Sequence, residues 1–596
     1  MKVRESREEL IVRVRFLSGV LVCFLLVVLL GFWRVQIASG EHFRGLAENN
    51  RLRRQPVESL RGLILDREGR VLVENVASYN LLLHRERSRN LPESLGFAAE
   101  VLGRHREELE DALARGRSPR GFGGLLLAEN LSLAEVARFG VAGFEHPEFE
   151  IQVHHLRLYR HGPQTAHALG YLAEVTEKEL ARKGSDYQAG DQIGRLGVEQ
   201  TFDSLLRGKD GEQVVVVDSR GRLVEEFHEV PPEEGERLEL TLDLELQQEA
   251  SELLREKVGS VVALDPRTGE ILALVSSPSY DPNIFSRRLQ EDEWRRLLEA
   301  PHDPLQNRAI QNTYSPGSLF KIVMAIGGLS EGAIAPQERI WCGGSARHYN
   351  RRFRCWKRGG HGWVNLREAL KSSCDVYFYE VGQRLGIERI ARYARLLGLG
   401  SKTRIDLAGE SPGLVPDLEW AAKERGTSWY PGETISVAIG QGPLLATPLQ
   451  MAKLMAMVAN SGKEIVPHLD RGADLVAAPE PDLHPEVLAR VSEALWAVVN
   501  ETKGTGGQAR LDGLDIAGKT GTVQVVAQNT WVDSKTLPPD QRDHAWFASF
   551  APSQAPELVV VVFVEHGGKG SEAAAPIARA LYEKYFEAKH RHHRAG

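Results

Sequence analysis

The stretch from Ser260 to Pro282, SVVALDPRTGEILALVSSPSYDP, decides the fold class of the second half of this 596-residue chain. Two runs rich in valine, leucine and alanine flank the segment Asp265 to Gly269, whose Asp, Pro and Gly are typical turn residues. Strand-forming runs joined by a short turn of this kind predict a β-hairpin. We therefore expect an antiparallel strand pair near the start of a domain.

Three further strand-like runs lie close to the end of the chain, at residues 516–526, 545–550 and 558–564, and residues 576–586 have the spacing of an amphipathic helix. Strands at both ends of a domain with helices between them favour an antiparallel sheet covered by helices, which is an α+β architecture. We assign this domain to residues 236–590.

The first half of the chain has the pattern of a separate module. Residues 61–75 predict a second hairpin, residues 91–138 have helical spacings, and residues 193–211 combine glycines with an amphipathic helix. The run Pro231 to Gly235 (PPEEG) breaks any regular element and marks a boundary. The expected module is a mixed α/β domain over residues 38–235.

The N-terminus carries the longest apolar run, which is free of charge from Phe16 to Trp33. At about 1.5 Å per residue this run nearly crosses a hydrocarbon core of about 30 Å, and extension to Ile37 spans it comfortably. Basic residues precede the run, which favours a cytoplasmic tail over residues 1–15 and a transmembrane helix over residues 16–37. The alternatives are a buried core helix and a cleaved signal peptide, although an ordinary signal-peptide core has only about 7 to 15 apolar residues.

The overall composition excludes two broad classes. Hydrophobic residues make up 42% of the chain, charged residues 26%, and the net charge is −7. This balance is that of globular domains and excludes wholesale disorder and a polybasic nucleic-acid binder. We expect no nucleic-acid partner and no organic cofactor.

Three short strings carry candidate chemistry. In the first, SPGSLFK, Ser318 begins a helix and Lys321 follows one turn later on the same face, so that an amine can accept the proton of a nucleophilic hydroxyl. The second string contains Ser373 and Asp375. The third, a strand, contains Lys519, Thr520, Gly521 and Thr522, whose hydroxyls and ammonium group suit a substrate carboxylate. Each string alone also fits an ordinary helix cap, loop or edge strand.

The combination is specific, because Ser-x-x-Lys, Ser-x-Asp and Lys-Thr-Gly in this order resemble the motif set of penicillin-interacting serine acyltransferases. The whole chain is similar to class B penicillin-binding proteins. The first half resembles their pedestal, or dimerisation-type, domain at Arg61-Gly62, Arg157 with Tyr159, and Gly194 with Gly197 and Glu199. Asp375 stands where most of these enzymes have asparagine, and the elongation subgroup carries a similar aspartate.

The resemblance implies a peptidoglycan D,D-transpeptidase of cell-wall elongation and cell-shape maintenance, acting through an acyl-serine intermediate and acylated by β-lactams. It implies Ser318 as nucleophile, Lys321 as base, Ser373 with Lys519 as proton relay, and the backbone amides of Ser318 and Thr522 as the oxyanion hole. The alternatives are a D,D-carboxypeptidase, or a membrane-anchored regulatory subunit of a glycan polymerase.

The resemblance also implies a location and partners. The chain is expected in the bacterial inner (cytoplasmic) membrane, anchored by one pass, with the catalytic domain on the outer, periplasmic side. Expected partners are peptidoglycan stem peptides, β-lactams, a SEDS-family (RodA-like) membrane glycan polymerase and other elongation-complex proteins.

Three of the four cysteines indicate a metal site. Cys23 lies in the apolar run, whereas Cys342, Cys355, His361 and Cys374 together offer the ligands of a closed tetrahedral Cys₃His zinc site. A Cys342–Cys355 disulfide with an unpaired Cys374 and a loop histidine is the alternative. Similar ligand positions in relatives of the elongation subgroup favour structural zinc.

Overall fold

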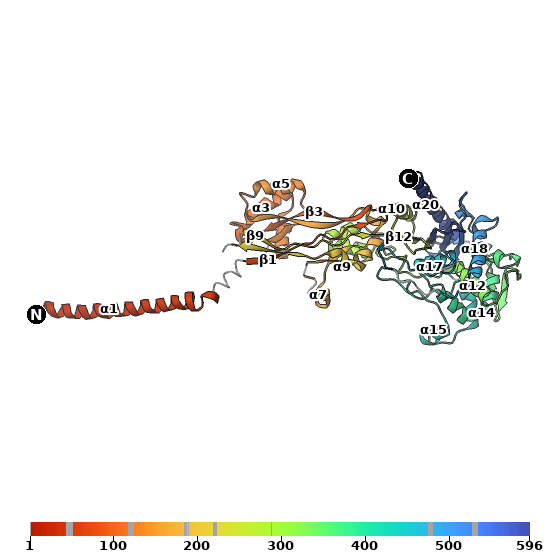
Figure 1. Cartoon of the computed structure of the whole chain (residues 1–596), viewed down its shortest axis with the longest axis horizontal. Helices are drawn as coiled ribbons and strands as arrows, with labels where there is room; N and C mark the ends of the chain where they lie inside the picture. The colour runs from red at the N-terminus through yellow and green to blue at the C-terminus, as the bar shows by residue number, and fades with distance from the viewer. Residues whose placement is uncertain are drawn as a thin grey trace. The chain divides into compact units, whose positions relative to one another are not determined.

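The computed structural model describes residues 2–42, 52–116, 124–183, 187–188, 190–217, 223–287, 289–474, 481–526 and 534–595 (Figure 1). The chain divides into two compact units. The first comprises residues 1–60, 77–155 and 208–234, and the second comprises residues 61–76, 156–207 and 235–596. The chain crosses between the two units several times, once between Glu234 and Gly235, one residue before the boundary expected at 235–236.

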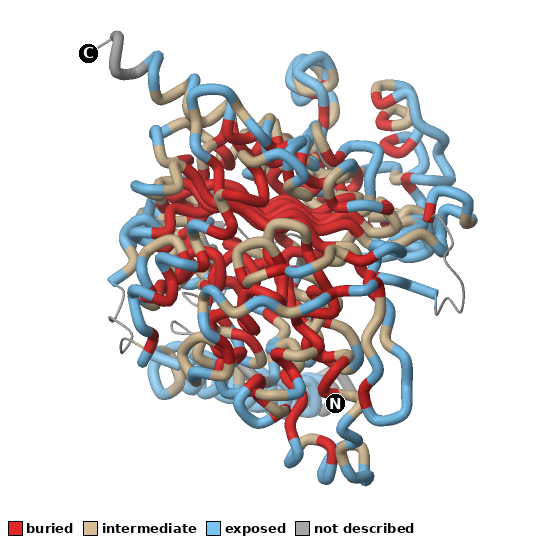
Figure 2. The backbone as a smooth tube through the Cα atoms, turned by 90° about the vertical axis from the view of Figure 1, so that its right-hand side faces the viewer, coloured by how far each residue is buried: buried red, intermediate tan, exposed pale blue. Residues whose placement is uncertain are grey.

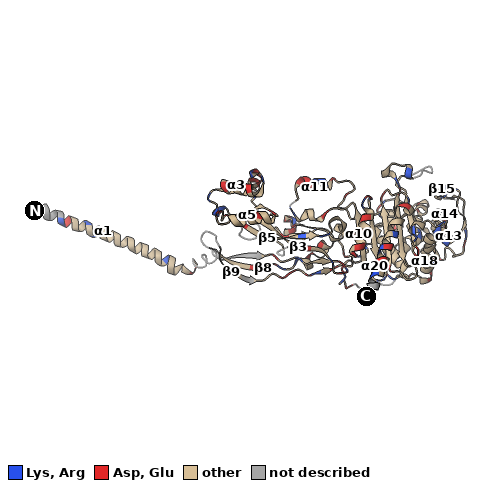
Figure 3. Ribbon diagram, turned by 90° about the horizontal axis from the view of Figure 1, so that it is seen from above, with Lys and Arg blue, Asp and Glu red and all other residues tan. Residues whose placement is uncertain are grey.

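The first unit begins with the apolar helix. Helix α1 (Lys2–Trp33) continues into a π-helical turn (Arg34–Ala38), and in the described residues this is the single helix long and apolar enough to cross a membrane. Its charged residues gather toward the N-terminal end (Figure 3). Its apolar side chains, including Phe16, Phe24 and Trp33, are exposed, as expected of a membrane anchor.

The rest of the first unit has a sheet and a small helical core. Strands β1 (Leu52–Val57), β8 (Gly211–Val217) and β9 (Leu223–Val230) form an antiparallel sheet in the order β1-β8-β9. Helices α3 (Leu91–Leu102), α4 (Arg106–Ala114) and α5 (Leu133–Ala142) pack around buried leucines and Phe139. The helical pattern expected over 91–138 is interrupted by β4 (Leu125–Ala128), because this short apolar run pairs with the end of β3 (Val71–Leu83).

The second unit contains a five-stranded antiparallel sheet in the order β12-β11-β19-β18-β17. Its strands are β11 (Gly259–Leu264), β12 (Ile271–Ser277), β17 (Ala517–Val523), β18 (His544–Ala551) and β19 (Leu558–Val564). The opening hairpin is therefore β11-β12, and the three late runs complete the same sheet. This confirms the α+β prediction.

Both faces of this sheet are covered, so it appears in Figure 2 as a buried central band. Alternate residues of β19 enter different cores: Val559 and Val561 pack with α17 (Pro448–Ala459), whereas Val560 and Val562 pack with α10 (Leu244–Leu254) and α20 (Ala575–Ala595). A strand buried on both faces is apolar throughout, because successive side chains point to opposite sides.

The other elements of the second unit complete it around this core. The helices are α6 (Ala166–Leu169), α7 (Glu177–Lys183), α8 (Gly197–Thr201), α9 (Asp203–Arg207), α11 (Glu291–Leu298), α12 (Lys321–Ser330), α13 (Leu366–Lys371), α14 (Asp375–Leu396), α15 (Leu418–Lys423), α16 (Pro431–Val437), α18 (Pro485–Asn500) and α19 (Gly570–Ala573). Short strand pairs are β6 (Leu172–Glu174) with β7 (Gln192–Gly194), β13 (Ile340–Cys342) with β16 (Gly362–Val364), and β14 (Ser345–His348) with β15 (Arg351–Arg354). Strand β2 (Ile64–Leu65) pairs with β10 (Leu238–Glu239). Strand β5 (Phe149–Tyr159) pairs with β3, and each of these two strands has residues in both units.

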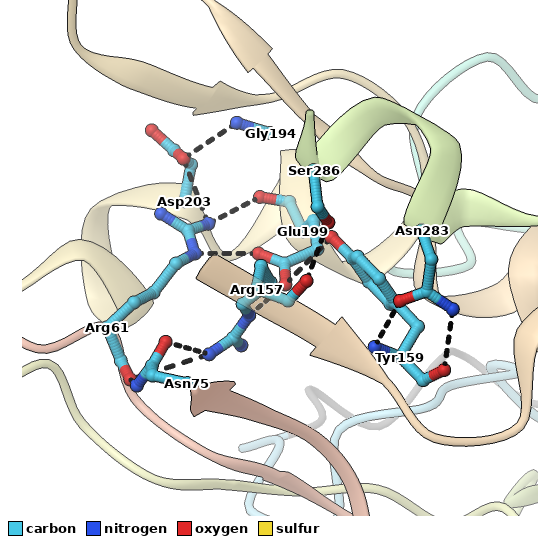
Figure 4. A network of polar contacts seen from close by, with 9 residues as sticks. All are labelled: Arg61, Asn75, Arg157, Tyr159, Gly194, Glu199, Asp203, Asn283 and Ser286. Atoms are coloured by element: carbon cyan, nitrogen blue, oxygen red, sulfur yellow. Dashed lines mark hydrogen bonds and ion pairs between the residues drawn. The ribbon is translucent and has the colours of Figure 1, made fainter. Parts of the chain in front are cut away.

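A buried ion network holds the segments 61–76 and 156–207 together within this unit (Figure 4). The fully buried Glu199 carboxylate accepts hydrogen bonds from Arg61 Nε at 2.7 Å and Arg157 Nε at 2.8 Å. Arg61 also pairs with Asp203 at 3.0 Å, and Arg157 donates to the Asn75 side chain at 3.1 Å. Two cations and two anions therefore compensate one another where water is excluded.

The same network is tied to the segment that follows β12. The Asn283 side chain both donates to and accepts from the backbone of Tyr159, each at 2.9 Å, and the Ser286 hydroxyl donates to the Arg157 carbonyl at 2.6 Å (Figure 4). The 3₁₀ turn Pro282–Ser286 is thereby fixed to β5. Residues before and after the expected boundary thus form one packed body.

Candidate active site

The first motif lies in a tight turn ahead of α12. Ser318 belongs to the 3₁₀ turn Gly317–Phe320, and the fully buried Lys321 is the first residue of the helix. Gly317 has φ +54°, and a Cβ there would lie 2.7 Å from the side chain of Val523. Because only glycine fits this backbone conformation beside β17, the sequence Pro-Gly-Ser sets the position of the hydroxyl.

The first and second motifs meet through hydrogen bonds. Ser373 Oγ donates to Ser318 Oγ at 3.1 Å, and Lys321 Nζ lies 3.2 Å from Ser373 Oγ and 3.0 Å from the Ser373 carbonyl. Within the described residues, Lys321 therefore reaches Ser318 through Ser373 and not by a direct hydrogen bond. A continuous chain of hydrogen bonds therefore joins Lys321, Ser373 and Ser318.

Asp375 fixes the lysine from the other side. Its Oδ1 accepts from Lys321 Nζ at 2.6 Å, and its Oδ2 accepts from the backbone N–H of Trp356 at 2.9 Å. Burial raises the pKa of Asp375, while the adjacent Lys321 ammonium opposes this rise. The aspartate thus links the candidate base to the segment that carries Cys355.

Ser373 has an unusual backbone conformation for a residue with a side chain. Its φ is +52°, in the left-handed region that costs an L-residue about 1–2 kcal/mol. The turn is held by neighbours: the Trp356 indole N–H donates to the carbonyls of Ser372 and Ser373, both at 3.1 Å. Such strain persists where surrounding contacts fix it, which is common at functional sites.

The third motif lies on β17, at the edge of the large sheet. Lys519 is fully buried, and its Nζ donates to the Thr520 carbonyl at 3.1 Å. Burial, and then the nearby positive charge of Lys321, lower the pKa of Lys519 well below its usual value.

The strand of the third motif lies close against the nucleophile turn. A Cβ at Gly521 would lie 3.3 Å from the Pro316 carbonyl and 2.9 Å from Trp546 Cβ. Thr520 Oγ1 donates to Thr505 Oγ1 at 2.9 Å, and Thr522 Oγ1 lies 3.5 Å from the Gly570 amide. The structure thus brings all three motifs together, with Gly317 and Gly521 where β17 and the nucleophile turn approach one another.

The four candidate metal ligands also converge. Cys342, Cys355, His361 and Cys374 place their ligand atoms within 4.8 Å of one another, and the three cysteines are buried and free of disulfides. His361 Nδ1 lies 3.6 Å from Cys342 Sγ and 3.5 Å from Cys355 Sγ. The cluster can hold a metal ion, and it adjoins the second motif because Cys374 lies between Ser373 and Asp375.

Sequence reasoning missed two residues of this site. Trp356 contacts the second motif through both its backbone and its indole, and Thr505 supports Thr520 from a glycine-rich loop. Neither belongs to a motif, since each reaches the site by folding from a distant segment. The position of Trp356 directly after Cys355 was the one available signal.

Two protein-family models match this chain, one in each half. The penicillin binding protein transpeptidase domain matches residues 259–583, and the penicillin-binding protein dimerisation domain matches residues 56–240. The first match includes all three motifs and all four candidate metal ligands.

Full-length relatives agree with these matches. The chain is 34% identical to the peptidoglycan D,D-transpeptidase MrdA of Haemophilus influenzae, over 96% of this chain and 92% of the relative. Among solved structures, the complex of Helicobacter pylori penicillin-binding protein PBP2 with MreC is similar with a TM-score of 0.82 and 28% identity, covering 89% of this chain and 99% of that chain. A chain from a peptidoglycan synthase complex, described as coordinating polymerization and crosslinking, is similar with a TM-score of 0.72 and 30% identity, covering 96% of this chain and 98% of that chain.

Proposed function

This chain belongs to the penicillin-binding protein transpeptidase family, as a peptidoglycan D,D-transpeptidase of the PBP2 type that acts in cell-wall elongation, and we propose that Ser318 is its nucleophile. The observation that carries the proposal is the hydrogen-bonded path from Ser318 through Ser373 to the buried Lys321. A serine hydroxyl becomes a nucleophile when a base accepts its proton, and this path supplies one.

The acylation step follows from this geometry. Ser318 Oγ attacks the carbonyl between the two terminal D-alanines of a stem peptide, and its proton passes by exchange at the Ser373 hydroxyl to Lys321, which acts as base in its neutral amine form. The tetrahedral oxyanion is stabilised by the backbone amides of Ser318 and Thr522, a role supported by the close approach of β17 to the nucleophile turn. The C–N bond then breaks, and a proton delivered through Ser373, with Lys519 behind it, leaves with D-alanine.

The second step transfers the acyl group. An amine from a neighbouring stem peptide attacks the Ser318 ester, its surplus proton returns through the same groups, and a cross-link forms. Thr520 and Thr522 are proposed to hold the terminal carboxylate of the donor, since hydroxyl donors bind an anion well in a site that excludes water. β-Lactams resemble the D-alanyl-D-alanine terminus and acylate the same serine.

A labelled penicillin tests the nucleophile. Full-length protein should bind the label covalently at the peptide that contains Ser318, and Ser318→Ala should abolish labelling while keeping its thermal unfolding temperature. Ser315→Ala, three residues earlier, is the matched control and should still be labelled. Covalent labelling of Ser318→Ala would refute the assignment.

The ion proposed for the Cys₃His cluster is zinc. A tetrahedral site with Zn–S of about 2.3 Å and Zn–N of about 2.0 Å places its ligand atoms about 3.5–3.8 Å apart. The sulfur-to-nitrogen distances of 3.5 and 3.6 Å at His361 fit this arrangement, as does the soft thiolate donor set. The ion would be structural, joining β13, the turn at Cys355 and the start of α14.

We further propose the location and partners of the enzyme. The apolar α1 supports a single-pass anchor in the cytoplasmic membrane with the catalytic domain outside, a transmembrane segment over residues 16–37, a pedestal over 38–235 and a transpeptidase domain over 236–590. The similarity to an MreC-bound protein and to a synthase complex supports elongation-complex proteins and a SEDS-type polymerase as partners.

Two further activities are compatible with this proposal. Transfer of the acyl group to water would give a D,D-carboxypeptidase side activity, and product analysis with and without an amine acceptor separates it from cross-linking. A regulatory role of the pedestal toward the polymerase is supported by the match to the synthase complex. A pedestal variant that still binds penicillin but no longer stimulates the polymerase would establish that role.

A further inference from the structure

A short segment near the second motif has a composition unlike the rest of the protein. Between Arg339 and Val364 there are six arginines, one lysine and no acidic residue, although the whole chain has a net charge of −7. Four large aromatic side chains of the same segment are more than half exposed: Trp341, Tyr349, Trp356 and Trp363. We call residues 339–364 the aromatic–cationic lobe. It consists of the pairs β13-β16 and β14-β15, and it packs beside α14 (Figure 3).

Two tryptophans form a defined pair on one face of this lobe. Trp341 on β13 and Trp363 on β16 are directly opposite one another in the antiparallel register. Their ring centroids lie 5.7 Å apart with planes inclined at 62°, and the residues are 57% and 58% exposed. The two indoles are therefore neighbours, and each residue is more than half exposed to solvent.

The opposite face of the strand pair β13-β16 is buried within the protein. Cys342 is fully buried in the metal cluster and Val364 is buried in the core. Because side chains alternate along a strand, Trp341 and Trp363 are directed away from both. Exposed large apolar groups beside one another cost solubility, and their occurrence on a soluble domain indicates a binding surface.

The lobe is physically joined to the active site. Trp356 donates its indole N–H to the carbonyls of Ser372 and Ser373, and its backbone N–H donates to Asp375. Ser373 in turn contacts Ser318. Trp356 therefore joins the lobe to the motif that contacts Ser318.

We propose that the aromatic–cationic lobe binds the glycan strand whose stem peptide enters the catalytic site, with Trp341 and Trp363 stacking on sugar rings and the arginines pairing with stem-peptide carboxylates. The inference rests on the proposed function, because it takes its ligand from that reaction. The apolar C–H face of a pyranose ring complements an indole face, and guanidinium groups bind carboxylates in bidentate geometry. A glycan strand carries sugar rings and, on its stem peptides, regularly spaced carboxylates. The lobe carries exposed tryptophans and arginines, which bind these two kinds of group.

Binding of soluble, uncross-linked glycan strands to the full-length protein in detergent tests this proposal. Three probes are compared by fluorescence anisotropy: strands with pentapeptide stems, the same strands with the stems removed, and a free stem pentapeptide. Trp341→Ala with Trp363→Ala should raise the Kd for both kinds of strand at least tenfold and leave the free pentapeptide unaffected. Trp341→Tyr with Trp363→Tyr should retain most of the affinity.

Neutralising two arginines tests the contribution of charge to binding. Arg351→Gln with Arg352→Gln should weaken only strands that carry stems, and the loss should shrink as salt is raised, because exposed charge pairs are screened. Phe144→Ala, an exposed aromatic of the other unit, and Arg296→Gln, an exposed arginine on α11, are the matched controls and should bind strands normally. Zinc content and unfolding temperature of each variant verify that the lobe is folded.

The outcomes separate this inference from the proposed function. Wild-type protein that is not labelled by penicillin would overturn the transpeptidase mechanism itself. Normal labelling together with unchanged strand affinity in the double tryptophan variant would overturn only the glycan-binding inference. If the double tryptophan variant binds strands normally but loses cross-linking only when a polymerase is present, the glycan-binding inference is likewise overturned. The lobe would then be assigned to binding of a protein partner.

Discussion

Replacement of Cys374 by serine tests whether the proposed metal cluster holds the second motif in its active conformation. Cys374 is a fully buried candidate ligand, lies between Ser373 and Asp375, and is the N-cap residue of α14. Serine is a favourable N-cap residue, so the variant retains the start of the helix while exchanging a thiolate ligand for a weakly ligating hydroxyl. The substitution therefore separates metal binding from helix capping.

The size of the effect follows from the backbone of Ser373. Its left-handed conformation, at φ +52°, costs about 1–2 kcal/mol, which neighbouring contacts must offset. If the ligand beside it is lost, this cost favours other conformations in which Ser373 no longer meets Ser318 and Lys321. At about 1.4 kcal/mol per factor of ten, the rate of acylation should fall about 5- to 30-fold.

The assay measures the second-order rate of acylation by a fluorescent penicillin, together with zinc per polypeptide by elemental analysis. Cys374→Ser should lose zinc and acylate more slowly, whereas Cys23→Ser, in the exposed apolar helix, should match the wild type in both measurements. Loss of zinc with acylation within twofold of wild type would refute the argument that ligation positions Ser373. Retention of one zinc ion would refute the ligand assignment of Cys374.

Three other substitutions probe separate parts of the structure. Glu199→Gln leaves the buried Arg61 and Arg157 facing a neutral amide, so the free energy of unfolding measured by denaturant titration should fall by about 3–5 kcal/mol. Glu291→Gln, at an exposed ion pair, is the control. An unchanged unfolding midpoint for Glu199→Gln would contradict the prediction. Burial lowers the pKa of His167 to about 4. Between about pH 6.5 and pH 4 the unfolded state therefore binds a proton at this histidine that the folded state does not, and the stability of the folded protein should fall as pH falls through this range. The melting temperature of His167→Gln should not show this part of the pH dependence. If both proteins lose stability equally on acidification, His167 is not responsible. Trp356→Phe removes the one indole N–H that is shared by the carbonyls of Ser372 and Ser373, a hydrogen bond worth about 0.5–1.5 kcal/mol, and should slow penicillin acylation several-fold. A rate equal to wild type would show that the indole N–H does not position the motif.

Local patterns were enough to predict most elements of the fold. The hairpin at Ser260, the strands near the C-terminus and the apolar helix at the N-terminus depend on periodicity and turn chemistry within a few residues, which a sequence displays directly. The interruption at β4 was missed, because the run Leu125–Ala128 is as apolar as a helix face and becomes a strand only by pairing with Leu81–Leu83. Pairing partners of this kind are not encoded locally.

The amino-acid sequence by itself determined the chemistry of this protein: a serine with a lysine one turn later, a Ser-x-Asp pair, a Lys-Thr-Gly strand and four thiol and imidazole groups. It did so because these functional groups are properties of residue types, and their spacing along the chain was enough to indicate a family. Tertiary structure alone decided how the groups are connected. That Lys321 reaches Ser318 through Ser373, that Asp375 accepts from Trp356, and that Trp341 and Trp363 face solvent together all depend on contacts between segments far apart in sequence. Such contacts are selected by packing and burial across the whole domain, and no local pattern specifies them.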